Sequence, residues 1–174
     1  MVSTQRAFIF LKDIEFKEIS DRMDPNSVRW QFFTKWENSG DTPTKDLTIS
    51  LGCDLFFEMH PLPAELPDNV DFPYNDFKDV PIVIGPKAFI TAPSITLPEA
   101  NLDKLKLAIK PHHNQYRFFM WGEAKYRDVF RFTKKHTTRF CVELSFEEQF
   151  HPGEVIRKQP IMSYNYYIKH NYAD

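Results

Sequence analysis

Glycine, cysteine and long apolar runs are scarce in this sequence. Of 174 residues, 5 are glycine and 2 are cysteine. Two cysteines are too few for a disulfide scaffold. No apolar run reaches the roughly 18 residues that suggest a membrane helix, and the apolar stretch at residues 7–11 is too short for a signal peptide. The formal net charge of −2 gives no general reason to expect nucleic-acid binding.

The motifs of the common metal, nucleotide and hydrolase sites are also missing. The sequence contains no CxxC, HExxH, GxSxG, GxGxxG or P-loop. His112 and His113 are adjacent, so in a strand they point to opposite faces. Asp68, Asp71 and Asp76 supply oxygen donors, but their spacing differs from that of an EF-hand loop. We therefore expect no metal site and no cofactor.

Aromatic residues are abundant, at 16% of the chain, and the clearest pattern lies in residues 116–146. Two runs of alternating side chains flank a short basic turn there. In the first run, one face carries Phe118, Met120, Gly122, Ala124 and Tyr126. In the second run, one face carries Thr138, Phe140, Val142, Leu144 and Phe146. A period of two is typical of half-buried antiparallel strands, so this region is predicted to be a β-hairpin.

Alternation predicts further strands along the chain. Two of them place apolar side chains on one face: Val28, Trp30, Phe32, Thr34 and Trp36 in the first, and Leu47, Ile49, Leu51 and Cys53 in the second. Residues 6–19 are also predicted to be a strand, with one face that carries Phe8, Phe10, Ile14 and Phe16. Ile9 and Leu11 lie on the opposite face, so the first half of this strand is apolar on both faces. Residues 80–84, 87–91 and 162–168 are further strands. Thr96-Leu97-Pro98-Glu99 fits a capping box, which predicts one short helix ending before Pro111.

The fold class follows from this order of elements. Seven or eight strands with one helix predict a mainly β protein, a two-sheet antiparallel sandwich of immunoglobulin-like architecture. A closed β-barrel is the alternative. We predict a single domain over residues 1–174. It contains an acidic loop at residues 54–79, where four prolines and seven acidic residues accompany one lysine. A loop of this length is often functional.

The two cysteines are predicted to remain separate thiols. Cys53 is in register with Leu47, Ile49 and Leu51, whereas Cys141 takes the parity opposite to that of Phe140. The two sulfurs then point to different faces and do not meet easily. A disulfide is the less favoured alternative.

Three segments together resemble a known group of proteins. They are Gln5 to Phe10; Trp36 to Thr44, which reads Trp-Glu-Asn-Ser-Gly-Asp-Thr-Pro-Thr; and Gly122 to Phe130, followed by His136 to Cys141. Their order and spacing are similar to those of the soluble domain of uncharacterised bacterial proteins that N-terminal membrane helices usually tether. The resemblance covers about residues 5–146 and brings no established activity. It implies a bacterial, membrane-tethered protein whose anchor is absent from this chain.

Tyr126, Asp128 and His136 form the first candidate site. Tyr126 and Asp128 lie two residues apart near the hairpin tip, and His136 begins the return strand. A carboxylate beside an imidazole can fix its tautomer, as in many acid–base sites. The favoured interpretation is structural: Asp128 accepts backbone N–H bonds of its turn and His136 is a cross-strand partner. A hydrolase that uses Asp128 and His136 is the alternative.

The same hairpin is locally basic. Residues 125–139 contain Lys125, Arg127, Arg131, Lys134, Lys135 and Arg139 against one aspartate. A protein, a lipid headgroup or a small anionic ligand is a candidate partner here. A solvated hairpin that faces the acidic loop of the same chain is the alternative. No nucleic-acid-binding motif accompanies the basic residues, so we expect no nucleic-acid partner.

Aromatic residues on the outward parity form a third candidate surface. Phe33, Phe119 and Trp121 share it, and such platforms serve sugar binding in many sandwiches. Coverage by the helix and the acidic loop is favoured, because an uncovered aromatic sheet would aggregate. The sequence as a whole favours a non-enzymatic interaction or ligand-sensing domain, with a carbohydrate-binding module or a hydrolase as alternatives.

Overall fold

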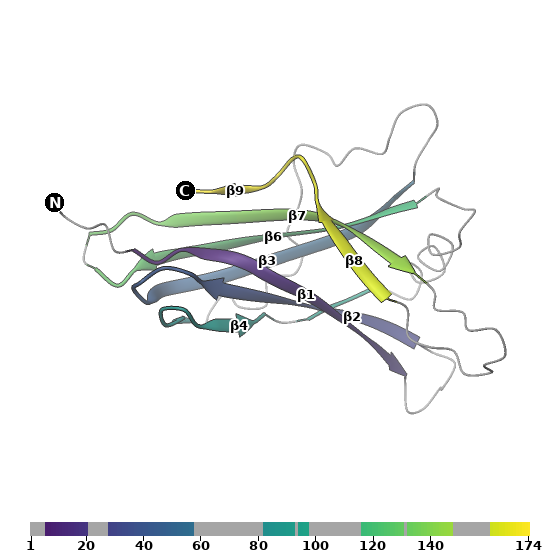
Figure 1. Cartoon of the computed structure of the whole chain (residues 1–174), viewed down its shortest axis with the longest axis horizontal. Coiled ribbons are helices and arrows are strands. Elements are labelled where there is room, and N and C mark those ends of the chain that lie inside the picture. The colour runs from purple at the N-terminus through teal and green to yellow at the C-terminus, as the bar shows by residue number, and fades with distance from the viewer. Residues whose placement is uncertain are drawn as a thin grey trace.

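Two antiparallel sheets stacked face to face make up the structure, a computed structural model (Figure 1). It describes residues 6–20, 28–57, 82–92, 94–97, 116–130, 132–147 and 161–174. His112-His113 and the three aspartates considered for calcium lie outside the described residues. Most of the predicted helix also lies outside the described residues. Of its predicted start, Thr96 and Leu97 are described, and Thr96 lies in a strand.

The first sheet contains four strands. β1 (Ile9–Ser20) pairs antiparallel with β2 (Val28–Asn38). The other edge of β2 is lined in succession by β4 (Phe89–Thr91) and β5 (Ile95–Thr96). β1 is therefore an edge strand of this sheet among the described residues.

The second sheet contains five strands. β3 (Thr44–Phe57), β6 (Tyr116–Asp128) and β7 (His136–Glu147) are neighbours in that order. β8 (Ile161–Tyr166) pairs with the second half of β7, and β9 (Tyr172–Ala173) pairs with its first half. The β6–β7 hairpin predicted from the sequence is thus confirmed, and its turn lies at the left end of the sandwich in Figure 1.

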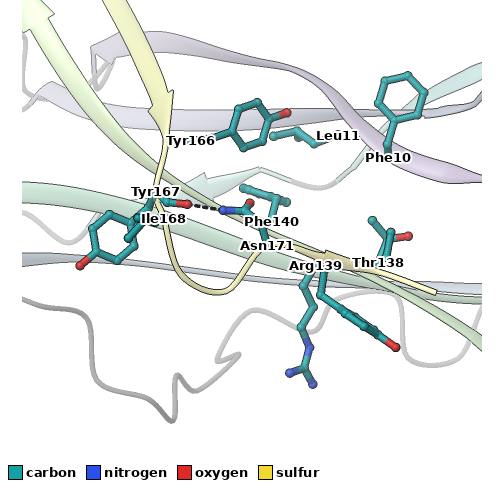
Figure 2. A pocket seen from close by; sticks show the side chains of 11 residues that line it. Phe10, Leu11, Thr138, Arg139, Phe140, Tyr166, Tyr167, Ile168 and Asn171 are labelled. Atoms are coloured by element: carbon teal, nitrogen blue, oxygen red, sulfur yellow. Dashed lines mark hydrogen bonds between the residues drawn. The ribbon is translucent and has the colours of Figure 1, made fainter.

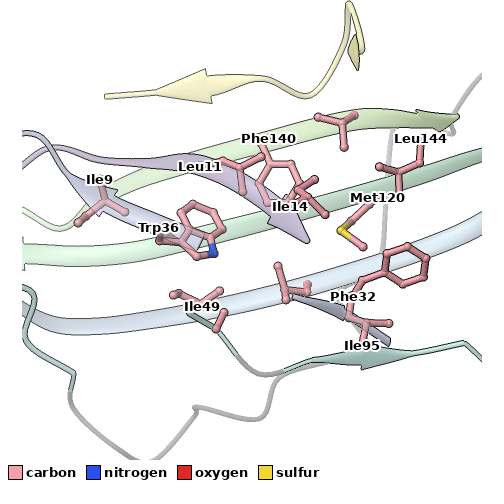
Figure 3. Close-up of a cluster of buried hydrophobic side chains, with 14 of the residues drawn as sticks. Ile9, Leu11, Ile14, Phe32, Trp36, Ile49, Ile95, Met120, Phe140 and Leu144 are labelled. Carbon is pink, nitrogen blue, oxygen red and sulfur yellow. The ribbon is translucent and has the colours of Figure 1, made fainter. Parts of the chain in front are cut away.

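The core lies between the two sheets, where aromatic and branched side chains from both pack together (Figure 3). Trp36 of β2 contacts Phe140 of β7, with ring centroids 5.4 Å apart. The inward faces predicted for β2, β3, β6 and β7 are buried at every described position apart from the half-buried Cys53. No strand ladder joins the sheets among the described residues, so the sandwich prediction is confirmed and the barrel alternative is wrong.

The prediction of which side chains of the first strand face the core is wrong for the first half of that strand. Ile9 and Leu11 are buried, whereas Phe10 is only half-buried. The register with β2 shifts between Leu11 and Asp13, which marks a β-bulge. One extra residue reverses the parity of the strand. Ile14 after the bulge therefore faces the core together with Leu11 before it.

Three other boundaries differ from the prediction. Residues 54–57 of the predicted acidic loop belong to β3, and the rest of the loop lies outside the described residues. The strand predicted at residues 80–84 is reduced in the described part to one isolated bridge, between Leu47 and Ile82. The last predicted strand ends at Tyr166, so Ile168 lies beyond it and is exposed.

The buried Asn38 fixes the connection between the two sheets. Its side-chain Oδ1 accepts the N–H groups of Phe8 at 3.1 Å and of Gly40 at 3.0 Å. Its Nδ2 donates to the carbonyl of Thr42 at 2.7 Å and to that of Ile84 at 3.2 Å. Satisfying this many backbone groups explains a fully buried amide at the end of β2.

Both cysteines are free thiols, as the parity argument predicted. Cys53 packs against the core between the sheets, and Cys141 belongs to a second cluster of buried residues. Burial, with a smaller contribution from Asp54, raises the pKa of Cys53 to about 12. Burial, with a smaller contribution from Glu143, likewise raises the pKa of Cys141 to about 12.

Candidate functional site

Asp128 and His136 contact each other where β6 ends and β7 begins. His136 Nε2 lies 3.2 Å from Asp128 Oδ2. The other oxygen, Asp128 Oδ1, accepts the backbone N–H of Ala7 at 2.6 Å, and Ala7 is 121 residues away in the sequence. Asp128 thus accepts a backbone N–H, as predicted, but the donor belongs to the chain just before β1, and no bond to an N–H of its own turn is found among the described residues. The hairpin is thereby tied to the first sheet.

Tyr126 makes a second tie to β1. It is the cross-strand partner of His136, and the two ring centroids are 5.4 Å apart. Its hydroxyl oxygen accepts the backbone N–H of Ile9 at 3.3 Å. Burial raises the pKa of the Tyr126 phenol, so the neutral form is favoured.

The other nitrogen of His136 faces Asp174. His136 Nδ1 lies 3.5 Å from Asp174 Oδ1, and the same oxygen accepts the backbone N–H of Thr137 at 2.8 Å. The Thr137 N–H lowers the pKa of the Asp174 carboxyl, and Lys134 and His136 lower it further. The imidazole thus lies between two carboxylates, one on β6 and one after β9, and Nδ1 makes no hydrogen bond among the described residues.

This geometry fits a structural tie better than an open acid–base site. His136 is 3% exposed and Asp128 is 4% exposed. Both ring nitrogens of His136 face carboxylates, and no hydroxyl or thiol hydrogen-bonds to them in the described part of the chain. A substrate would have to displace Asp174 to reach Nδ1 and Asp128 to reach Nε2. The pair joins the beginning of β1, the hairpin and residue 174.

The Glu123 carboxylate forms ion pairs with two of the basic residues of the hairpin. Its carboxylate binds Lys125, and it accepts hydrogen bonds from Arg139 Nε at 2.8 Å and Nη2 at 2.7 Å. Burial acts to raise the pKa of Glu123, but the bonds from Lys125 and Arg139 outweigh it and lower the pKa. Lys125 and Arg139 therefore contribute less free charge than the sequence suggested.

The remaining basic residues lie closer to the turn. Arg127 Nη1 is 3.8 Å from Asp46, and Lys134 Nζ is 3.8 Å from Asp174. Lys135 is exposed, and no ion pair of it is found among the described residues. Arg131 lies outside them. Long, exposed pairs such as these stabilise a fold by little, so the two lysines stay available to a partner.

Large apolar side chains at the turn are the feature that the sequence interpretation missed. Val129, Phe130 and Phe132 are all exposed, and Phe132 is fully so. Phe132 has a backbone φ of 64°, a left-handed conformation that is unusual for an aromatic residue. The signal was present in the sequence: apolar residues filled a turn where polar residues and glycine are usual. We call Val129, Phe130, Phe132, Lys134 and Lys135 the hairpin tip.

An open groove of about 440 Å³ lies between the edge strand β1 and the C-terminal segment (Figure 2). Phe10 and Leu11 line it from β1, and Tyr166, Ile168 and Tyr172 line it from the segment. Asn171 shapes this segment. It accepts the N–H of Cys141 at 2.9 Å, and its amide nitrogen donates to the carbonyl of Tyr167.

Aromatic residues predicted to face outward on the second sheet are buried. Phe119 and Trp121 form a small cluster with Cys141, and Phe56 and Tyr167 pack against it. Trp121 is therefore no surface platform. Tyr167 of the C-terminal segment and Phe56 are the described residues that cover this face. The helix and residues 58–79 of the acidic loop, which were expected to cover it, lie outside the described residues, and Phe33 on the first sheet is half-buried.

Searches of the described part of the chain for a metal site and for a membrane-spanning helix, and of known proteins for a relative, give no positive result. Among the described residues, no group of three or more His, Cys, Asp or Glu side chains is placed to hold a metal ion. None of their segments is a helix long and apolar enough to cross a membrane. Protein-family models, curated proteins and solved structures yield no match to the chain.

Proposed function

We propose that this protein is a non-enzymatic interaction domain whose contact surface is the hairpin tip, and that it belongs to a bacterial protein tethered to a membrane. The observation that carries the proposal is the full exposure of Phe132 beside two exposed lysines. Soluble proteins rarely leave apolar side chains grouped in water without a partner. The tether rests on the resemblance of residues 5–146 to the soluble domains of anchored bacterial proteins.

A hydrolase that uses Asp128 and His136 is the competing class. Their burial and their bonds to Ala7 and Asp174 favour a role in stability. Catalysis would need an open path to the imidazole and a reacting group beside it. Neither condition is met in the described part of the chain.

Photo-crosslinking tests the interaction proposal even when the partner is unidentified. A photoreactive phenylalanine analogue replaces Phe132 in the full chain, and in a control it replaces Ile161. Ile161 is 50% exposed and pairs with Glu147, at the end of β7 remote from the turn. After irradiation in living bacteria, we expect a protein or lipid adduct from position 132 and none from position 161. Equal adducts at both positions, or none at either, would refute the proposal.

A carbohydrate ligand in the groove is the second candidate. Tyr166 and Tyr172 are exposed and line the groove, and sugars pack well on such rings. A glycan array tests this function directly. We expect Tyr172→Ala to abolish any specific signal, whereas an array without signal would remove this candidate.

A further inference from the structure

The hairpin tip combines apolar and basic side chains at one end of the sandwich. Phe132 is fully exposed, Phe130 is 53% exposed and Val129 is 42% exposed. The tip lies where the β6–β7 turn forms the left end of the second sheet in Figure 1. The turn has a defined structure: the Thr133 hydroxyl donates to the carbonyls of Asp128 and Phe130, at 3.3 and 3.2 Å.

The charge next to these apolar residues is positive. Lys134 and Lys135 follow the turn directly, and both are exposed. Of the acidic residues near the tip, Asp128 is buried against His136 and Ala7, and Asp174 lies 3.8 Å from Lys134 Nζ in a long pair of the kind that contributes little. An anionic surface that approached the tip would therefore meet two ammonium groups and the apolar rings together.

We propose that the hairpin tip docks on an anionic lipid bilayer. Phe130 and Phe132 enter the interface, and Lys134 and Lys135 remain at the headgroups. This inference rests on the proposed function and names the partner of the same surface. Aromatic rings and lysines favour this depth of a membrane, where the rings leave water and the ammonium groups bind anionic lipids.

A bilayer fits the tip better than a protein surface does. A stable protein interface buries roughly 800 Å² on each partner, whereas the tip offers only three apolar side chains next to its lysines. A projecting turn can enter a fluid interface without a preformed pocket. Lysine also suits a diffuse anionic surface, because its ammonium group is a point charge that needs no fixed pairing geometry.

Vesicle binding of the full chain tests the inference. Phosphatidylcholine vesicles with and without phosphatidylserine are sedimented with the protein at low and high salt. We expect binding to the phosphatidylserine vesicles, and weaker binding at high salt because the charges are screened. Phe132→Ser should weaken this binding roughly tenfold or more, since the buried ring is lost.

Matched variants show whether a loss of vesicle binding is specific to the hairpin tip. Lys134→Glu with Lys135→Glu should remove the preference for phosphatidylserine, at about fivefold or more per lysine. The charge control is Lys17→Glu with Arg29→Glu, because both residues lie towards the far end of the β1–β2 pair. Ile161→Ser is the apolar control. Both controls should bind as the unmodified chain does, and circular dichroism checks that every variant is folded.

The outcomes distinguish the inference from the proposed function. If the chain ignores both kinds of vesicle, or if Phe132→Ser binds them as Ile161→Ser does, the lipid inference is overturned. A protein adduct from position 132 would then leave the interaction proposal standing. The absence of any adduct at position 132 would instead overturn both the lipid inference and the interaction proposal.

Discussion

Replacing Asp128 by alanine should unfold this protein at a clearly lower temperature. The Asp128 carboxylate faces two buried partners, the Ala7 N–H at 2.6 Å and His136 Nε2 at 3.2 Å, and two hydrogen bonds to a charged group contribute about 3–6 kcal/mol together. His136 keeps its contact with Asp174, so we expect the lower end of this range, about 3 kcal/mol. For a chain of this length that corresponds to a fall in Tm of about 6–12 °C.

Thermal unfolding followed by circular dichroism measures this effect, and Asp128→Asn is its control. Asparagine retains an oxygen that accepts the Ala7 N–H, so we expect a smaller loss, about 1–1.5 kcal/mol. Urea unfolding gives the same comparison in free energy. A Tm for Asp128→Ala within about 1 °C of the unmodified chain would refute the structural tie, since a buried pair of this kind cannot be removed at no cost.

Three further predictions concern packing, thiols and pH. A Cβ at Gly122 would lie 2.3 Å from a buried phenylalanine ring carbon, whereas one at Gly85 finds its nearest atom at 4.0 Å. Gly122→Ala should therefore cost about 1–3 kcal/mol in urea unfolding and Gly85→Ala much less; equal losses would contradict this packing. Cys53 and Cys141 should react with a thiol reagent at pH 8 only after unfolding, because burial raises both thiol pKa values to about 12; fast labelling of the folded chain would contradict this. The pKa of Asp174 is lowered in the folded chain, so its contribution to stability is present above the ordinary aspartate pKa and is lost as the pH falls through the lowered value. Asp174→Asn should flatten this acid-side dependence, and an unchanged profile would contradict it.

Much of the sandwich could be predicted from alternation alone. In β2, β6 and β7 the inward face is apolar along most of its length, and β6 and β7 pair with each other in one uninterrupted register over the core. Such strands need only local information. The pairing of β6 with β7 also followed, because a short turn joins the two strands.

The bulge in β1 could not be predicted in the same way. Both parities of its first half are apolar, so the sequence gives no reason to prefer Ile9 over Phe10 for the core. The choice is made by the extra residue between Leu11 and Asp13 in the pairing with β2. That pairing is a tertiary property.

In the candidate site, too, local contacts could be predicted from the sequence and long-range contacts could not. The proximity of Asp128 and His136 followed from the hairpin register, but the bond from Ala7 spans 121 residues and has no local signal. Asp174 reaches His136 through the short strand β9, which its sequence did not indicate. The exposed rings of the hairpin tip, in contrast, could have been inferred from apolar residues in a turn.

Fluorescence of a Phe132→Trp variant tests the membrane contact most directly. The native tryptophans Trp30, Trp36 and Trp121 are buried, so their emission should not respond to vesicles. With phosphatidylserine vesicles we expect the new tryptophan to shift to shorter wavelength and to be quenched by brominated lipid chains. An emission maximum that stays at the value of a fully hydrated indole, at lipid concentrations that sediment the protein, would contradict insertion of the hairpin tip.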